Sequence, residues 1–185
     1  MRSTLSTFFS ISFCFIAIAA ADLIHETCQK CAERSPILSY DLCVSSLQAI
    51  PPSHTASLPE LAVISVKLAL VNATATLWSI QKLLENEASD PNLMGSLKDC
   101  QELYSDAVPT LENSITAFKR LDYRSGNVLI TAAMDAATTC EGGFDVSPLT
   151  KQNYDFFQLC DIVLVITRLI PSELPFLLSM YSQIL

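Results

Sequence analysis

SLPELAVISVKLALVNATATLWSIQKLLENE, residues 57–87, carries the clearest helical signal of the chain. Ser57 is followed three residues later by Glu60, which is the pattern of a capping box, and Pro59 lies in the first turn, where a missing N–H costs nothing. Apolar residues then recur at steps of three and four, so we expect a bundle helix that runs to about Glu87. The predicted buried seam consists of Leu61, Ile64, Leu68, Val71, Ala75 and Trp78.

Three more amphipathic helices are predicted downstream. Their start and stop signals are Asp90-Pro91 for the second helix, Asp122 and Gly142-Gly143 for the third, and Ser147-Pro148 or Thr150 for the fourth. Their predicted buried stripes are Leu93, Leu97, Cys100, Tyr104, Ala107, Leu111, Ile115 and Phe118, then Val128, Ala132, Ala136 and Cys140, then Phe156, Leu159, Val163, Ile166 and Ile170. Pro109 should kink the second helix rather than end it, because the pattern resumes beyond it. Residues 161–170 are apolar nearly all round, so the fourth helix should be the most buried.

Upstream, residues 22–50 predict a helical hairpin. Its arms are expected at residues 23–32 and 40–49, with a turn at residues 34–36, and Pro51-Pro52 ends the second arm. Short connections between the long helices imply an all-α, up-down-up-down four-helix bundle over residues 57–170. The tail at residues 171–185 is more apolar than an exposed tail should be, and the pattern assigns it no role.

The first 21 residues have the pattern of a secretory signal peptide. Arg2 supplies a basic start, residues 8–19 are almost wholly apolar, and Ala19 and Ala21 form a small-x-small cleavage site before Asp22. The alternative is a membrane anchor, but the apolar run is too short to span a bilayer comfortably. We therefore expect a protein secreted to the extracellular space, with no membrane span.

The formal net charge of the chain is −8, and loss of Arg2 with the leader would make it one unit more negative. Binding to phosphate groups needs concentrated Lys and Arg. The charge therefore argues against nucleic acid or an anionic membrane as partner, and it is compatible with a basic protein.

Six cysteines follow the predicted leader, an even number that suggests disulfides in an oxidising compartment. Cys28 and Cys43 lie at similar distances on either side of the predicted hairpin turn, so we expect them to pair. Cys100 and Cys140 lie at comparable heights on either side of the turn at Asp122, so we expect a second disulfide there. Two further cysteines, Cys31 and Cys160, are left to pair with each other, to remain thiols or to pair between molecules.

Several segments together resemble the plant invertase/pectin methylesterase inhibitor family. They are CQKCAERSPILSYDLC (28–43), PSHTASL (52–58), LAVISVKLAL (61–70), TAAMDAATTCEGGF (131–144) and VSPLTKQNY (146–154), and the likeness covers residues 22–170. The resemblance implies a cell-wall or apoplastic inhibitor that forms a stoichiometric complex with a plant pectin methylesterase or acid invertase. It also implies that Cys28 pairs with Cys43 and that Cys31 is the extra cysteine.

Within that family, invertase inhibitors resemble one another in a Pro-Lys-Phe motif at the turn into the third bundle helix. The corresponding positions here are Tyr123, Arg124 and Ser125, where only the positive charge is kept. The stretch from Asp122 to Cys140 is more similar to the pectin methylesterase inhibitors, so both targets stay open. Tyr123 and Arg124 are candidate anchors for a partner, because Tyr and Arg are enriched at interface hot spots; the alternative is an ordinary helix start.

Other functional patterns are weak. Asn72 begins an Asn-Ala-Thr glycosylation sequon, with an unmodified helical asparagine as the alternative. Cys28-Gln29-Lys30-Cys31 has the spacing of a redox or zinc motif, but a βαβ context or further ligands would be needed. With His25 and His54 as the chain's two histidines, no catalytic triad is visible, and we expect no catalytic residue, metal or cofactor. The rival interpretations are a non-inhibitory storage or ligand-binding protein on the same scaffold and an extracellular hydrolase.

Overall fold

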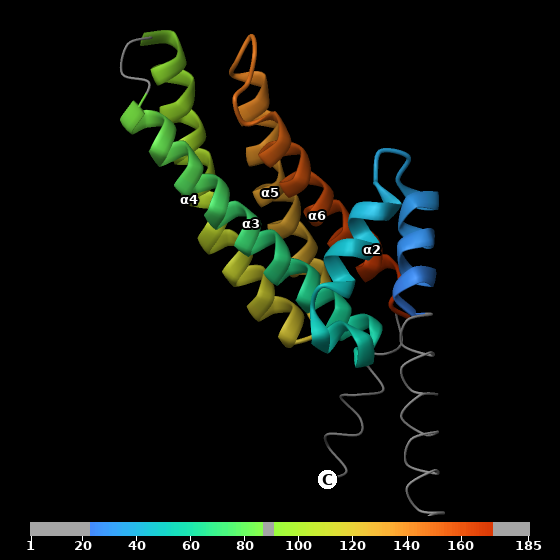
Figure 1. The fold of residues 1–185 in the computed structure, drawn as a ribbon. Coiled ribbons are helices and arrows are strands. Elements are labelled where there is room, and N and C mark those ends of the chain that lie inside the picture. The colour runs from blue at the N-terminus through green and yellow to red at the C-terminus, as the bar shows by residue number, and fades with distance from the viewer. Residues whose placement is uncertain (1–22, 87–90, 172–185) are drawn as a thin grey trace, which may run out of the picture.

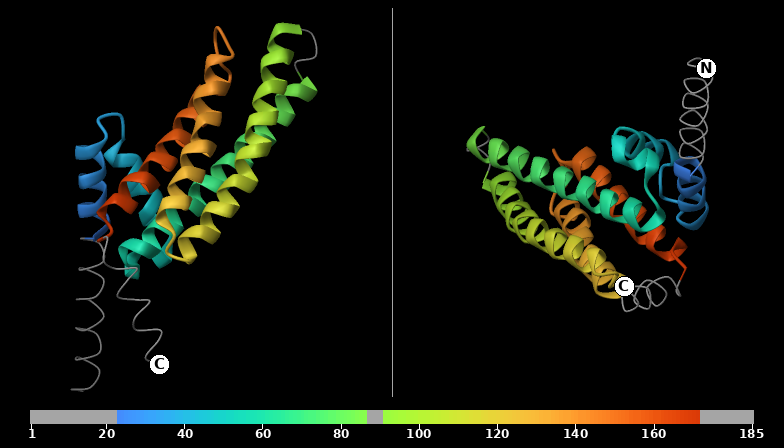
Figure 2. Two further views of the ribbon diagram at one scale, coloured as in Figure 1. Left: turned by 180° about the vertical axis from the view of Figure 1, so that it is seen from behind. Right: turned by 90° about the horizontal axis from the view of Figure 1, so that it is seen from below.

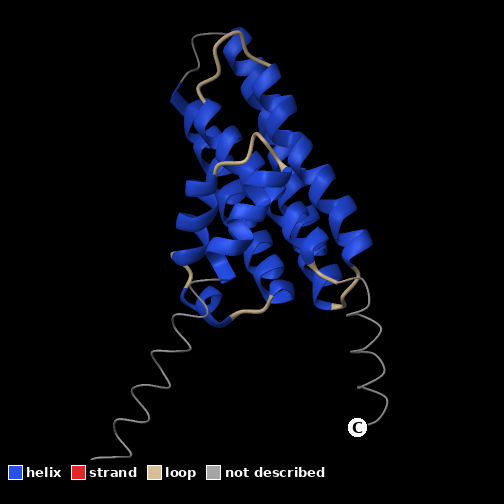
Figure 3. Ribbon diagram, turned by 90° about the vertical axis from the view of Figure 1, so that its right-hand side faces the viewer, coloured by secondary structure: helices blue, strands red, loops and turns tan. Residues whose placement is uncertain are grey.

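The computed structural model describes residues 23–86 and 91–171, and every regular element within them is a helix (Figure 3). A first helix covers residues 23–34. The elements that follow are α2 (Tyr40–Gln48), the 3-10 helix η1 (Pro51–Thr55), α3 (Leu58–Asn86), α4 (Pro91–Lys119), α5 (Tyr123–Gly142) and α6 (Thr150–Leu169). The signal peptide predicted at residues 1–21, the predicted cap Asp90 and residues 172–185 of the tail lie outside the described residues.

The four long helices form the predicted up-down-up-down bundle (Figures 1 and 2). Each helix packs against two neighbours: α3 and α5 lie on one diagonal, and both contact α4 and α6. Successive helices therefore lie side by side and run in opposite directions, which short connections favour.

The first helix and α2 form the predicted hairpin, which lies outside the bundle, beside α6 and the start of α3 (Figure 1). A disulfide between Cys28 and Cys43 joins its two arms, as expected. Gln158 of α6 holds the hairpin loop at two points: its Oε1 accepts from the Ser39 N–H at 2.7 Å, and its Nε2 donates to the Ile37 carbonyl at 2.6 Å. Gln158 is buried, so these hydrogen bonds form away from water and fix the hairpin on the bundle.

Two of the predicted helix starts, at Ser57 and Asp122, carry side-chain hydrogen bonds, whereas the start of α6 has no side-chain cap. The N–H and the hydroxyl of Ser57 both donate to the Glu60 carboxylate, at 2.8 and 2.7 Å. Asp122 caps α5, because its Oδ1 accepts from the Ser125 N–H at 3.0 Å. The last helix begins at Thr150, the later of its two predicted starts.

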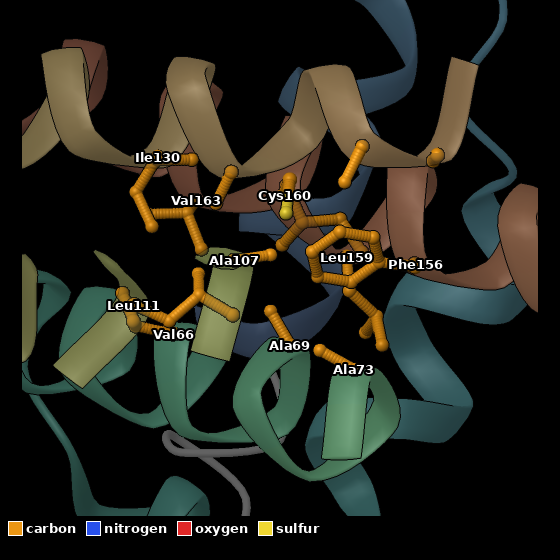
Figure 4. Close-up of a cluster of buried hydrophobic side chains, with 14 of the residues drawn as sticks. Val66, Ala69, Ala73, Ala107, Leu111, Ile130, Phe156, Leu159, Cys160 and Val163 are labelled. Atoms are coloured by element: carbon orange, nitrogen blue, oxygen red, sulfur yellow. The ribbon is translucent and has the colours of Figure 1, made fainter. Parts of the chain in front are cut away.

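The core lies between all four long helices, and Figure 4 shows their side chains meeting. All five residues of the predicted α6 stripe are buried, and so is the predicted α4 stripe except for Leu93 and Ile115, which are half-buried. The residues labelled in Figure 4 are Val66, Ala69 and Ala73 of α3, Ala107 and Leu111 of α4, Ile130 of α5, and Phe156, Leu159, Cys160 and Val163 of α6. Helix α4 continues through Pro109, so the proline does not end it.

The seam predicted for α3 was largely wrong. Val71 and Trp78 are 67% and 61% exposed, and Ala75 is exposed between them; of the predicted seam only Leu61 is buried. The other residues that α3 buries are Ala62, Ser65, Val66, Ala69, Ala73, Thr76 and Ile80.

Small side chains explain this choice of face. Ala, Ser and Thr let the neighbouring helices approach closely, and the buried hydroxyls do not lack partners. Ser65 donates to the Leu61 carbonyl at 2.8 Å and Thr76 to the Asn72 carbonyl at 2.9 Å, each one turn earlier in the helix. A polar residue with a local acceptor can therefore be buried at little cost.

The stripe predicted for α5 needs a similar correction. Val128 and Ala132 are exposed, whereas Ala136 and Cys140 are buried as expected. The buried residues of α5 are Gly126, Ile130, Ala133, Ala136, Ala137 and Cys140, again mostly small. The close contact between α5 and α4 is made by the face of α5 that carries Gly126. The larger Val128 lies on another face and stays exposed.

Among the described residues, α3 alone is long and apolar enough to meet the length and composition expected of a membrane span. Core helices of soluble proteins meet the same criteria. Here α3 packs along α4 and α6 as one helix of the bundle, and 39% of its apolar window is buried, so the packing accounts for part of its composition.

Candidate target-binding surface

The turn between α4 and α5 fixes the predicted contact residues, 123–125, at one end of the bundle. The Leu121 N–H donates to the Phe118 carbonyl at 2.9 Å, and the Asp122 N–H donates to the Ala117 carbonyl at 3.0 Å, the Schellman pattern that closes a helix. Leu121 takes φ 60° to do so, a left-handed conformation that costs a non-glycine residue roughly 1–2 kcal/mol. Asp122 then caps α5, so the same residue closes one helix and opens the next.

Phe118 of α4 lies buried against the backbone of Gly126 on α5, where a Cβ would come within 2.0 Å of its ring. Tyr123 covers this ring, with the two ring centroids 5.9 Å apart. The Tyr123 hydroxyl is buried, has no hydrogen-bond partner among the described residues, and its burial raises the pKa of the phenol. Tyr123 thus packs on the bundle rather than pointing to solvent, whereas Arg124 and Ser125 are exposed.

The outward side of α5, which we term the α5 face, is nearly free of charge. Its exposed residues are Arg124, Ser125, Val128, Thr131, Ala132, Asp135, Thr138, Thr139 and Gly142. It holds one cation and one carboxylate, and Val128 at its middle is 65% exposed. The neighbouring α4 instead exposes four acidic residues, Asp99, Glu102, Asp106 and Glu112, against two lysines, Lys98 and Lys119. The α5 face is therefore a neutral strip on an acidic protein.

An open groove of about 430 Å³ separates the first half of α5 from the end of α6. Val128, Ala132 and Leu164 give it apolar walls, while Asp135 and Arg168 also line it and supply one charge of each sign. The groove is shallow and continuous with the α5 face. It can accept an apolar side chain flanked by polar groups.

Below this groove a hydrogen bond ties the two helices together. The Thr167 hydroxyl of α6 donates to Oδ1 of Asn127 on α5 at 3.0 Å. Because Thr167 is buried, the bond holds the spacing of the two helices where the groove opens.

A second groove, of about 580 Å³, lies between the end of α5, the start of α6 and the hairpin loop. Ile37 and Tyr154 are 60% and 50% exposed at its sides, and Ala137 and Phe157 add apolar surface. Glu141 supplies a carboxylate there. The two grooves lie along the α5–α6 edge, one near each end of α5.

Buried polar groups fix the second groove from behind. Asn153 of α6 accepts from the Tyr104 hydroxyl at 2.8 Å and donates to Glu141 at 2.7 Å, and the Thr150 hydroxyl donates to Glu141 at 2.6 Å. Burial would raise the pKa of Glu141, but hydrogen bonds from Thr150, Asn153 and Ser147 outweigh it and lower that pKa. The carboxylate therefore stays ionised and holds the end of α5 to the start of α6.

A disulfide joins Cys100 of α4 to Cys140 of α5, as expected. It lies one residue before Glu141, so the last turn of α5 is held to α4 covalently and to α6 by hydrogen bonds. With the turn at Asp122 fixing its other end, α5 presents its face with little freedom to move.

Comparison with known proteins identifies the scaffold. The model of the family described as "Plant invertase/pectin methylesterase inhibitor" matches residues 22–166. The chain belongs to this family. A relative from Platanus acerifolia named "Putative invertase inhibitor" is 44% identical over 168 residues, covering 88% of this chain and 93% of the relative. A "Pectinesterase inhibitor" from Actinidia deliciosa is 36% identical over 156 residues, covering 82% of this chain and 80% of the relative.

Solved structures of the inhibitor family share the fold. A mutant form of a pectin methylesterase inhibitor from Arabidopsis superposes with a TM-score of 0.63 at 24% identity, covering 71% of this chain and 90% of that one. A pectin methylesterase inhibitor from Arabidopsis thaliana gives 0.59 at 23% identity, covering 79% and 96%. At this identity the likeness establishes the architecture of the bundle.

Among the described residues, the two cysteines outside the disulfides, Cys31 and Cys160, are buried free thiols. Burial and the nearby Asp161 raise the pKa of Cys31 to about 12, with Arg34 opposing them, and burial raises that of Cys160. Thiolate is the reactive form, so neither residue is activated as a nucleophile. The Cys-x-x-Cys spacing has a structural explanation, because Cys28 is in the hairpin disulfide. Among the described residues no group of three or more His, Cys, Asp or Glu side chains is placed to hold a metal ion.

The glycosylation sequon lies within α3. Asn72 is half-buried, with its Oδ1 enclosed, and Ala73 is fully buried. The Thr74 hydroxyl donates to the Leu70 carbonyl at 2.8 Å. In the folded chain Asn72 is only partly exposed and lies inside a regular helix, so its glycosylation stays a proposal.

Sequence reasoning placed residues 123–125 at an exposed turn but missed both grooves. Their walls combine residues far apart in the chain, such as Ile37 with Tyr154 and Val128 with Leu164. No local motif marks such pairs. The one residue that could have pointed to a groove was the apolar Val128. The sequence pattern places Val128 in the buried stripe of its helix, but in the structure it lies on the surface.

Proposed function

We propose that this chain is a secreted inhibitor that binds a plant cell-wall carbohydrate-modifying enzyme, pectin methylesterase or acid invertase, and covers its active site. The α5 face is the observation that carries the proposal. Interface cores are depleted in charge relative to the rest of a protein surface. A neutral strip with two open grooves, on an otherwise acidic chain, is suited to bury itself against another protein.

Rigidity supports a steric mechanism. The Schellman turn at one end and the Cys100–Cys140 disulfide at the other hold α5 before any partner arrives. A surface that is already ordered loses little conformational entropy on binding, so more of the contact energy becomes affinity. In this mechanism the inhibitor supplies no chemistry. It occupies the space that the substrate needs.

Arg124 is the candidate polar anchor of the face. It is exposed at the first turn of α5 beside Ser125, while the Tyr123 ring packs beneath it on Phe118. A guanidinium there can pair with the carboxylates that polysaccharide-processing enzymes place in their active sites. Of the contact residues expected from sequence, Arg124 and Ser125 are kept in this proposal, and Tyr123 becomes a positioning residue.

The relatives' names support both targets. The Platanus relative is named as an inhibitor of invertase and the Actinidia relative as an inhibitor of pectinesterase. The proposal includes secretion to the cell wall through the leader at residues 1–21, which mass spectrometry would test by finding Asp22 as the first residue of the exported protein.

The test is a stoichiometric titration of the purified chain, in parallel, against one pectin methylesterase and one acid invertase. Activity of one enzyme should fall to a plateau near a one-to-one ratio. Val128→Asp and Arg124→Glu should weaken that inhibition at least tenfold, because each puts a carboxylate into the contact. Val71→Asp is the matched control: it changes an equally exposed valine on α3 and should leave inhibition unchanged.

Full activity of both enzymes at saturating inhibitor would contradict the proposal. It would favour the rival interpretation of a non-inhibitory binding protein, for which the apolar second groove supplies a specific observation. A groove of about 580 Å³ is within the range of small-ligand sites. Substrate turnover by the chain itself would instead indicate a hydrolase.

A further inference from the structure

Helix α3 carries an apolar stripe, Val71, Ala75 and Trp78, that no other part of the described chain covers. The three residues recur at i, i+4 and i+7 and so share one helix face. Trp is rarely left this exposed without a contact, because its large apolar surface favours burial. Lys82 lies over the Trp78 ring, 5.8 Å from its centroid, but does not enclose it.

The α3 stripe points away from the proposed target contact. Helices α3 and α5 lie on one diagonal of the bundle, and each packs inward on α4 and α6. Their outward faces therefore look in different directions, and the inhibition proposed above leaves the α3 stripe free.

We propose that the α3 stripe binds a second copy of this chain, with the two α3 helices antiparallel. We place the two-fold axis at the level of Thr76. A residue a given number of positions before Thr76 in one copy then lies at the same height as the residue equally many positions after Thr76 in the other copy. Trp78 of one copy then lies at the level of Thr74 of the other, beside Ala75. Each large ring is placed on small side chains, the pattern by which helices pack closely.

The charges beside the stripe favour this arrangement. Lys67 and Glu85 are exposed, equally far from Thr76, and a whole number of turns apart, so they lie on the same side of α3. An antiparallel pair brings Lys67 of each copy to Glu85 of the other. A parallel pair would place Lys67 and Glu85 of the two copies at different levels, so neither residue would meet an opposite charge.

The side chains are available for this exchange. Lys67 makes no ion pair within residues 23–86 and 91–171, and Glu85 pairs with Lys82 of its own helix at 2.8 Å. That pair is exposed, and exposed ion pairs hold their partners weakly. Lys82 can then extend its alkyl chain across Val71 of the second copy.

One helix face is small for a protein interface, so the dimer should be weak and concentration-dependent. Two copies joined through α3 would leave both α5 faces open. The assembly would therefore be a bivalent binder, which gains effective affinity on a surface that carries several target molecules.

The chain holds a single tryptophan, Trp78, so its fluorescence reports on the α3 stripe directly. The test uses the full mature chain, residues 22–185. Rising concentration should shift the emission to shorter wavelength in parallel with dimer formation in sedimentation velocity. Val71→Asp should raise the dissociation constant at least about tenfold, and Val128→Asp should leave it unchanged.

Charge reversal supplies a second test, independent of apolar packing. Lys67→Glu and Glu85→Lys should each weaken association, and the double variant should restore it, because the opposed charges are exchanged together. Circular dichroism would check that all variants are folded.

A chain that sediments as a monomer at every concentration would overturn the proposal, as would a dimer insensitive to Val71→Asp. A dimer lost on deletion of residues 172–185 but kept in Trp78→Ala would assign the contact to the tail. Monomers that float with lipid vesicles through Trp78 would assign the stripe to a membrane. None of these outcomes would bear on inhibition through α5.

Discussion

Gly126→Ala should destabilise the protein, although alanine is the better helix former. The added Cβ would lie 2.0, 2.2 and 2.9 Å from three atoms of the Phe118 ring. Ordinary contacts begin near 3.4 Å, so the ring would have to retreat by more than an ångström. Phe118 is 1% exposed and Tyr123 packs on its ring, so the ring can move only toward the groove of about 490 Å³ that it lines with residues of η1 and α3, and such a move would separate it from Tyr123.

The expected magnitude follows from two opposing effects. Replacing glycine by alanine inside a helix gains up to about 1 kcal/mol. Overpacking a closed core costs about 1–3 kcal/mol, and a clash of this depth belongs at the upper end. The net loss should be roughly 1–2 kcal/mol, or several degrees in Tm for a domain of this size.

Gly95→Ala is the matched control, because Gly95 lies in α4 and a Cβ there meets no atom within 4 Å. It should stabilise the protein by about 0.5–1 kcal/mol in the same urea or thermal unfolding assay. Phe118→Leu should partly rescue Gly126→Ala by removing the ring atoms that clash. If Gly126→Ala proved as stabilising as Gly95→Ala, the packing assigned to the α4–α5 contact would be wrong.

Three further changes test the groups around the α5 face. Asn153→Ala should cost about 1–3 kcal/mol, measured by urea unfolding, because it leaves the Tyr104 hydroxyl buried without its acceptor; Tyr104→Phe in the same chain should recover part of the loss. The pKa of Glu141 is lowered in the fold, so the ionised carboxylate stabilises the folded protein above its ordinary pKa near 4.5, and this stabilisation is lost as pH falls through the lower folded value. Glu141→Gln should therefore be less stable at pH 7 and should lose less stability on acidification. Equal pH profiles of the two proteins would contradict this. Tyr123→Phe should leave both stability and inhibition unchanged or slightly improved, since it removes a buried hydroxyl without a partner in the described structure; a marked loss of inhibition would show that this hydroxyl reaches the target.

Local signals predicted much of the fold. Ser57 with Glu60, and Asp122, carry their own capping chemistry, so helix starts could be read from a few adjacent residues. The stripe of α4 was predictable because charged residues separate its apolar positions, which leaves one face to bury. The cysteine pairings followed from the turns, since a hairpin sets the height of both arms.

The faces of α3 and α5 could not be read in this way. Both helices are rich in small and apolar residues on more than one side, so periodicity alone offers two faces of similar hydrophobicity. Close approach to the neighbours selects the small one: Ala69 and Ala73 go inside on α3, and Gly126 goes inside on α5. That selection depends on which helices pack together, and no window of sequence contains it.

The residues excluded from the core by this selection are informative about function. Leaving Trp78 or Val128 exposed forgoes burial worth roughly 1.5–3 kcal/mol for each large apolar side chain. Such a choice has two physical explanations: the bundle cannot accommodate the larger side chain on that side, or a partner supplies the missing contact. The small residues at the α3 and α5 seams establish the first. They also make the second explanation, a partner protein, testable. Because the close helix packing leaves Trp78 and Val128 outside, binding to another protein at these residues can recover the lost burial.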